Sequence, residues 1–157
     1  MKKAITLFVF VAVCELAGIV GTVFTAPSIT GWYAGLAKPV FNPPDWIFGP
    51  VWTVLYALMG VAAYLVYQQG FKRPEVKRAL TVFFVQLLLS ALWSIVFFGV
   101  HMILGALVVI VLLWAMILAT ILVFRGISKA AANLLVPYIL WVSFATVLNI
   151  SLYALNR

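Results

Sequence analysis

The chain has 157 residues, of which 67% are hydrophobic and 8% charged, against roughly 45–50% and about 25% in soluble domains. So few charges exclude a water-soluble fold and a disordered chain, and the single cysteine excludes a disulfide scaffold. The net charge of +7 comes from basic residues at segment ends, so it does not indicate nucleic-acid binding. The class that remains is an all-α membrane protein without room for a soluble catalytic domain.

Five apolar segments follow one another along the chain, and each has the length of about 20 residues that a helix needs to cross the hydrocarbon. They run over approximately residues 4–24, 47–67, 79–98, 103–124 and 132–155. The whole chain, residues 1–157, is therefore expected to form one five-helix transmembrane domain. A cleaved signal peptide is the alternative for the first segment, but this segment is longer than a signal peptide's apolar region and Glu15 interrupts it.

The basic residues divide unequally between the two sides of such a bundle. On the side of the N-terminus lie Lys2, Lys3, Lys72, Arg73, Lys77, Arg78, Arg125 and Lys129. The other side has Lys38 and Arg157. This asymmetry predicts a cytoplasmic N-terminus and an external C-terminus in an inner or plasma membrane. The dense group at residues 72–78 is interpreted as a cytoplasmic loop, with an anionic-lipid site as the alternative, and the short basic start is typical of a bacterial chain.

The first connection, residues 25–46, is long and far from polar. Its sequence, TAPSITGWYAGLAKPVFNPPDW, combines aromatic and aliphatic residues with four prolines that stiffen it. Long connections of this kind are usually functional. We predict a folded lid over the outer ends of the helices, with a short helix around residues 29–36 and Asp45 capping the second transmembrane helix.

Aromatic, small and amide residues recur at helical spacing on three of the segments. The stripes are Trp52, Tyr56 and Gly60 on the second, Gln86, Ser90, Trp93 and Phe97 on the third, and Tyr138, Trp141, Ala145, Leu148 and Asn149 on the fifth. The alternating topology places much of these stripes at related depths beneath the lid. They predict a site for a flat, largely apolar ligand with a few polar groups. The alternative is that the aromatic residues form an interfacial belt or pack the helices together.

Polar residues inside the segments are the second signal. Glu15 lies in the middle of the first span, where an ionisable residue is either functional or protonated and bonded to a neighbouring helix. Gln86 and Asn149 are candidates for hydrogen bonds between helices. Pro137 is expected to kink the fifth helix. The first span also has a small-residue stripe, typical of close helix packing, at Cys14, Gly18 and Thr22.

Metal and acid–base sites are not expected. The one histidine, His101, lies in the short third connection, where its use as an axial haem ligand is an unfavoured alternative. The three acidic residues, Glu15, Asp45 and Glu75, belong to three separate regions, so no carboxylate pair is available.

Three stretches resemble a known family. They are WYAGLAKPVFNPPDWIFGPVWTVLY at residues 32–56, QLLLSALWSIVFFG at residues 86–99 and VPYILWVSFATVLN at residues 136–149. In this order and spacing the chain resembles the TspO/MBR family of translocator proteins, tryptophan-rich sensory proteins and peripheral-type benzodiazepine receptors.

The resemblance implies a five-helix bundle, often a homodimer, that needs no cofactor and binds porphyrins such as protoporphyrin IX or haem. It also implies binding of synthetic isoquinoline carboxamides and benzodiazepines, of membrane lipids and, in animal members, of cholesterol. By position, Tyr33, Trp52, Trp141 and Ala145 correspond to pocket residues, and the stripe from Gln86 to Phe97 corresponds to the third-helix wall. Ser90 stands where the family commonly has Asn, so one amide hydrogen bond is missing.

Two further properties follow only from the resemblance. Some members are reported to promote light-dependent breakdown of porphyrin, for which Trp52 and Trp141 would be the catalytic residues. A loose sterol motif matches Leu148, Tyr153 and Arg157, although an interfacial Tyr and Arg explain the same pattern.

Four functions therefore remain open. The favoured hypothesis is a tetrapyrrole receptor or sensor, and the first alternative is a light-dependent porphyrin-degrading enzyme. A porphyrin or lipid transporter is less favoured, because the core has no relay of ionisable residues beyond Glu15 and no repeated broken helices. A purely structural assembly protein is the last alternative.

Overall fold

The computed structural model describes residues 2–157 and consists of helices joined by short connections and one longer loop. The elements are α1 (Lys2–Thr30), η1 (Tyr33–Gly35), η2 (Asp45–Ile47), α2 (Phe48–Tyr67), α3 (Pro74–Ser94), η3 (Ile95–Gly99), α4 (Ile103–Arg125), α5 (Lys129–Leu134) and α6 (Val136–Leu155). Within residues 2–157, five segments are long and apolar enough to cross a membrane, and α5 with α6 forms the fifth. The predicted five-helix bundle is confirmed.

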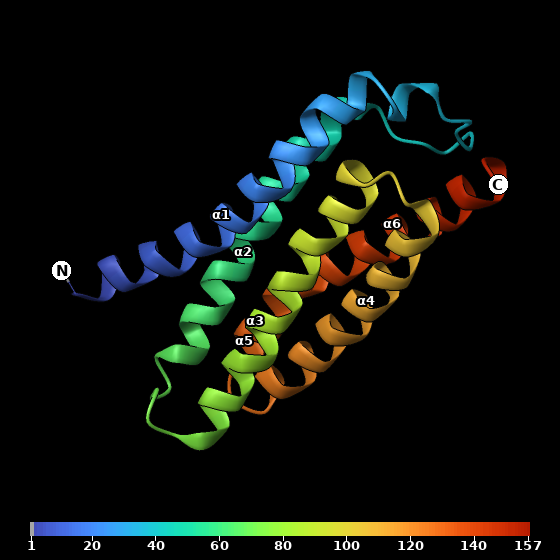
Figure 1. Ribbon diagram of the computed structural model, residues 1–157. Helices are drawn as coiled ribbons and strands as arrows, with labels where there is room; N and C mark the ends of the chain where they lie inside the picture. The colour runs from blue at the N-terminus through green and yellow to red at the C-terminus, as the bar shows by residue number, and fades with distance from the viewer. Residues whose placement is uncertain (1) are drawn as a thin grey trace.

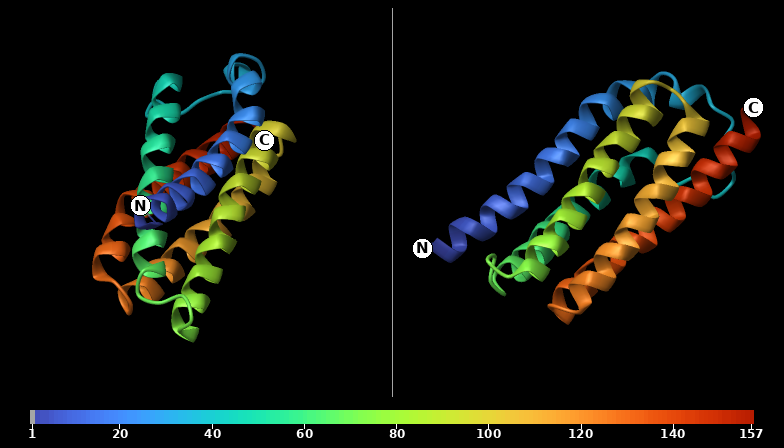
Figure 2. Two further views of the ribbon diagram at one scale, coloured as in Figure 1. Left: turned by 90° about the vertical axis from the view of Figure 1, so that its left-hand side faces the viewer. Right: turned by 60° about the horizontal axis from the view of Figure 1, so that its bottom comes forward.

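The two ends of the bundle differ in what they contain. The connections from α2 to α3 and from α4 to α5 lie at one end, and the loop after α1 lies with the C-terminus at the other (Figure 1). The left view of Figure 2 shows α1 and α2 diverging toward the end that holds this loop.

Two glycines set how α1 approaches α2. A Cβ atom added at Gly60 of α2 would lie 2.5 Å from the Cα of Val11, so only glycine permits this backbone contact. Nearer the loop end, a Cβ added at Gly18 of α1 would lie 2.6 Å from the ring of Tyr56. The N-terminal half of α1 is therefore in backbone contact with α2 at Val11, and one to two turns later α1 packs against the Tyr56 ring.

The outward faces of the helices are apolar. On α1, Phe8 is 71% exposed and Val23 is 66% exposed, and α4 similarly exposes Val108 and Leu122. Large apolar side chains on the outside, with the charged residues other than Glu15 at or near the helix ends, suit contact with lipid.

The helix boundaries correct several predictions. Helix α1 continues through Pro27 to Thr30, whereas the first span was expected to end near residue 24. Proline is tolerated because it lies in the last turn and removes only one backbone donor. The Ser28 hydroxyl holds this turn by donating to the carbonyl oxygen of Phe98 at 2.6 Å. The short helix expected at residues 29–36 is reduced to η1.

Three other predictions about the helix ends have mixed outcomes. The prediction that Asp45 caps the second helix is wrong, because a 3₁₀ turn at Asp45–Ile47 precedes α2 and no side chain caps that turn or the helix. Helix α3 begins earlier than expected, at Pro74, a residue suited to a first helical turn. The break expected from Pro137 is present, since α5 ends at Leu134 and α6 starts at Val136.

The loop at residues 31–44 forms the predicted lid. The amide N–H of Ala37 donates to Asn156 Oδ1 at 2.9 Å, and Asn156 Nδ2 donates to the Ala37 carbonyl at 2.9 Å. This reciprocal pair fastens the lid to the end of α6. On the other side, Trp32 stacks on the His101 ring with centroids 4.4 Å apart. The lid is therefore held against both α6 and the connection that follows η3.

Candidate functional site

A cavity of about 360 Å³ lies beneath the lid, between the loop-end halves of α1, α2 and α6 and the end of α3 with η3. This volume falls within the range of about 300–1,000 Å³ that is usual for small-molecule sites. It is lined by Glu15, Gly18, Ile19, Gly21, Thr22, Thr25, Ala26, Ile29, Tyr33, Phe48, Gly49, Trp52, Thr53, Tyr56, Trp93, Ser94, Phe97, Phe98, Trp141, Ala145, Leu148, Asn149 and Leu152.

The wall from α2 is aromatic. Phe48, Trp52 and Tyr56 recur every four residues, so they share one face of the helix. The rings of Trp52 and Tyr56 are stacked, with centroids 5.5 Å apart and planes at 29°. The hydroxyl groups of Tyr56 and Ser90 are 2.9 Å apart, which fixes the phenol against α3. The α2 wall is thus a continuous, oriented π surface.

Helix α6 supplies the facing aromatic ring and the space beside it. Trp141 contacts Phe48 edge to face, with centroids 6.1 Å apart. Its indole Nε1 is buried and has no hydrogen-bond partner within residues 2–157. One turn farther along α6, Ala145 is 8% exposed, and its small side chain leaves room in the wall. Because Nε1 itself has almost no surface on the cavity, a ligand acceptor reaches this donor only when the indole ring turns, and leaving the donor unpaired is costly.

The third wall comes from the end of α3 and the π-helical turn η3. Trp93 and Phe97 are stacked, with centroids 5.4 Å apart and planes at 23°. Trp93 Nε1 donates to Asn149 Oδ1 at 3.2 Å, and Asn149 Nδ2 donates to the Ile103 carbonyl at 3.1 Å. Asn149 therefore joins α3, α4 and α6, as predicted for a polar residue between helices.

The lid closes the cavity through Tyr33, which is 2% exposed. The Tyr33 hydroxyl donates to Asn42 Oδ1 at 2.7 Å, and Lys38 Nζ lies 4.8 Å from the centre of the Tyr33 ring. Burial raises the pKa of the Tyr33 phenol to about 12, and the negative charge of Asp45 adds to this increase. Tyr33 is therefore a neutral hydrogen-bond donor at physiological pH.

Most of the residues predicted for the site lie around the cavity. Those that line it are Tyr33, Trp52, Tyr56, Trp93, Phe97, Trp141, Ala145, Leu148 and Asn149. Gln86 and Ser90 do not line it. They are buried deeper in α3, where Ser90 bonds Tyr56 and the Gln86 amide has no partner within residues 2–157. The hydrogen bond between helices expected of Gln86 is therefore not formed.

The sequence did not predict that α1 forms part of the cavity wall. The α1 residues that line the cavity follow helical spacing from Glu15 to Ile29. The stripe of Cys14, Gly18 and Thr22 was interpreted as a packing surface, and for Gly18 against Tyr56 this is what the structure has. Farther along, α1 diverges from α2, and the same face borders the cavity instead.

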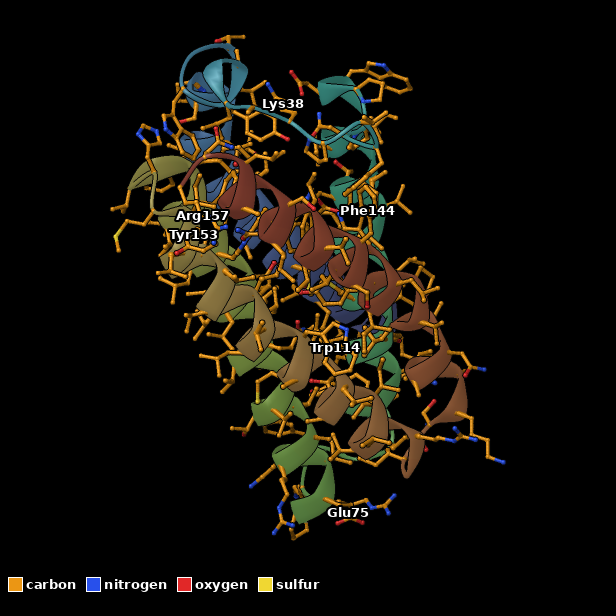
Figure 3. All side chains as sticks on the ribbon, turned by 90° about the vertical axis from the view of Figure 1, so that its right-hand side faces the viewer. Lys38, Glu75, Trp114, Phe144, Tyr153 and Arg157 are labelled. Carbon is orange, nitrogen blue, oxygen red and sulfur yellow. The ribbon has the colours of Figure 1, made fainter. Side chains whose placement is uncertain are left out.

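Other candidates lie outside the cavity. His101 is exposed in the connection after η3 and faces Trp32 and Ser28. Tyr153 and Arg157 lie near each other at the C-terminal end of α6 (Figure 3), whereas Leu148 lines the cavity. Trp114 of α4 is a packing residue, because its Nε1 donates to Ser143 Oγ on α6 at 2.8 Å. Within residues 2–157, no three His, Cys, Asp or Glu side chains come together as a metal site.

Comparison with known proteins identifies relatives over nearly the whole chain. The model of the TspO/MBR family matches residues 10–155. The tryptophan-rich protein TspO of Chlorobaculum tepidum is 44% identical over 155 residues, 99% of this chain and 98% of the relative. The human translocator protein is 38% identical over 91% of this chain and 85% of its own length. The tryptophan-rich sensory protein of Cereibacter sphaeroides is 38% identical over 83% of this chain and 85% of its own length.

Proposed function

Since the chain belongs to the TspO/MBR family, we propose that it is an integral membrane receptor or sensor that binds protoporphyrin IX or a related porphyrin in the cavity beneath the lid. The observation that carries this proposal is the pair of aromatic walls, Trp52 with Tyr56 on α2 and Trp141 on α6, around a partly open, largely apolar space. A flat ring system stacks on such walls without an axial ligand.

The polar groups of the cavity are few and separated, as a large apolar ring with polar substituents requires. The Trp141 Nε1 is unpaired and buried, so a turn of the indole ring on binding would present it as a donor to the ligand. Lys38 lies over the Tyr33 ring at the lid end, where its ammonium group would receive a carboxylate of the ligand. The Ser90 hydroxyl is already bonded to Tyr56, so we do not assign it a ligand contact.

The test is a titration of protoporphyrin IX into the purified protein in detergent, in the dark, followed by quenching of tryptophan fluorescence. Wild type is compared with the double variant Trp52→Phe/Trp141→Phe and with Trp46→Phe, which removes a lid-end tryptophan that is 74% exposed and outside the cavity. We expect saturable quenching, with affinity about tenfold weaker in the double variant because two indole stacking surfaces are reduced. Equal half-saturation in all three proteins would refute the proposal.

Light-dependent oxidation of the bound porphyrin is the second candidate function. The stacked Trp52–Tyr56 pair supports it, because adjoining aromatic rings are suited to electron transfer from protein to ligand. In this scheme Trp52 loses one electron to the photo-excited porphyrin, and the reduced porphyrin passes this electron to molecular oxygen, which becomes superoxide. The oxidised Trp52 then regains an electron from the porphyrin, so the net change is one-electron oxidation of the porphyrin by oxygen. Turnover in light, normalised to the amount of bound porphyrin, should then disappear in Trp52→Phe or Trp141→Phe. Unchanged turnover would remove this candidate.

We also propose the partners and orientation that the sequence favours. Synthetic isoquinoline carboxamide and benzodiazepine ligands would compete with porphyrin, and the exposed apolar face of α1 would contact lipid or a second copy of the chain. The positive charges at its end of the bundle favour a cytoplasmic N-terminus. Labelling with a membrane-impermeant maleimide in intact cells tests this, with Lys38→Cys expected to react and Lys72→Cys to be protected.

A further inference from the structure

Glu15 is the one charged side chain among the residues that line the cavity. It lies in the middle of α1 and is the cavity-lining α1 residue nearest the N-terminus. One turn farther along, Gly18 lies against the Tyr56 ring. The carboxyl group therefore lies at the end of the cavity away from the lid, beside the α2 aromatic wall.

The Glu15 side chain has no hydrogen-bond or ion-pair partner within residues 2–157. The ion pair found in these residues joins Arg73 to Glu75 at the start of α3, far along the chain from Glu15. An ionisable group within a membrane span is costly and is usually paired with another charge or with a ligand. Because the fold supplies no cation, a ligand is the remaining source of one.

The neighbouring aromatic rings complete a site for positive charge. Trp52 and Tyr56 present a stacked indole and phenol on the α2 wall, and Tyr56 is next to the α1 face that carries Glu15. The face of an aromatic ring attracts a cation, most strongly where water is excluded. A carboxylate beside such rings is the combination that recognises a protonated nitrogen.

We propose that the cavity binds flat aromatic amines, with the protonated nitrogen against the Glu15 carboxylate and the rings against Trp52 and Trp141. This inference rests on the proposed function only in placing a flat ligand in this cavity. The inference also assigns opposite charge preferences to the two ends of the cavity. A carboxylate is disfavoured at the Glu15 end, so the acidic groups of a porphyrin point toward Lys38 at the lid.

The test compares two dyes that share a three-ring frame at mildly alkaline pH. Proflavine carries amino groups and is protonated, whereas acridine lacks them and is neutral. Binding of each dye is measured by calorimetry to wild type, Glu15→Gln and the matched control Glu75→Gln, which removes an exposed carboxylate outside the cavity. We expect wild type and Glu75→Gln to prefer proflavine by about tenfold, and Glu15→Gln to bind both dyes equally.

The inference is overturned if Glu15→Gln binds proflavine as tightly as wild type does, or if wild type shows no preference between the dyes. If Glu15→Gln is unstable, Glu15→Leu carries the same comparison, because leucine suits a helix in lipid. Protoporphyrin IX quenching is measured on the same samples. A wild type that binds porphyrin but shows no preference between the dyes would refute this inference alone, whereas a wild type without saturable porphyrin quenching would refute the proposed function.

Discussion

Replacing Trp141 by phenylalanine separates ligand binding from folding. The indole Nε1 is buried in the cavity wall without a hydrogen-bond partner, so it contributes no internal bond to the unliganded protein. A buried donor left unpaired costs about 1–3 kcal/mol, and phenylalanine removes this cost while it keeps an aromatic ring against Phe48. We therefore expect the unliganded variant to remain within about 1 kcal/mol of wild type.

The affinity for the ligand, unlike the stability, should decrease in Trp141→Phe. If a ligand acceptor pairs with Nε1, its loss costs about 0.5–1.5 kcal/mol, which corresponds to an affinity about two- to twelvefold weaker. The assays are thermal unfolding in detergent without ligand and protoporphyrin IX titration in the dark. Trp93→Phe is the matched control. The Trp93 Nε1 donates to Asn149, and loss of this hydrogen bond should lower the unfolding temperature. A Trp141→Phe variant with wild-type affinity, or one as unstable as Trp93→Phe, would refute this reasoning.

Two further predictions concern the scaffold. Gly60→Ala should destabilise the protein by about 1–3 kcal/mol, because the added Cβ meets the backbone of Val11, whereas Gly35→Ala, where nothing lies within 4 Å, should not. Thermal unfolding measures both, and equal effects would contradict the close contact of α1 with α2. Asn156→Ala should loosen the lid, because it removes both bonds to Ala37. Faster proteolysis within residues 31–44 and faster porphyrin dissociation are expected, and wild-type rates for both would show that this pair does not hold the lid.

The sequence was sufficient for the bundle and for much of the cavity. Span length and hydropathy indicate the five helices, since a membrane β-barrel would need alternating apolar and polar residues that these segments lack. On α2 and α6 the aromatic and small residues recur at helical spacing, and lipid does not require them at mid-depth. Trp52 and Trp141 were therefore placed on inward faces, and both line the cavity.

The contribution of α1 could not be predicted in the same way. Its residues are apolar on every side, so periodicity does not distinguish the inward face. Whether Gly18 or Thr22 touches a neighbour or borders an open space depends on the angle between α1 and α2. That angle is set by the contact of Gly60 with Val11, and these two residues lie far apart in the sequence.

Local sequence also did not determine the lid or the deep end of α3. The bonds from Asn156 to Ala37 join residues 119 positions apart, so no pattern near either residue indicates them. Gln86 lies on the same face of α3 as Trp93. The Tyr56 phenol packs against this face and its hydroxyl bonds the Ser90 hydroxyl, so the cavity does not extend as far as Gln86. Spacing along α3 therefore predicted the correct face, but not how far along this face the cavity extends.

The proposal that this cavity is the ligand site is tested most directly by filling the cavity with a larger side chain. Ala145→Phe places a large ring in the wall beside Trp141, and Ala115→Phe makes the same change on an exposed face of α4. Protoporphyrin IX titration in the dark compares the two variants with wild type. We expect Ala145→Phe to lose saturable quenching and Ala115→Phe to retain it. Wild-type affinity in Ala145→Phe would show that the ligand binds elsewhere.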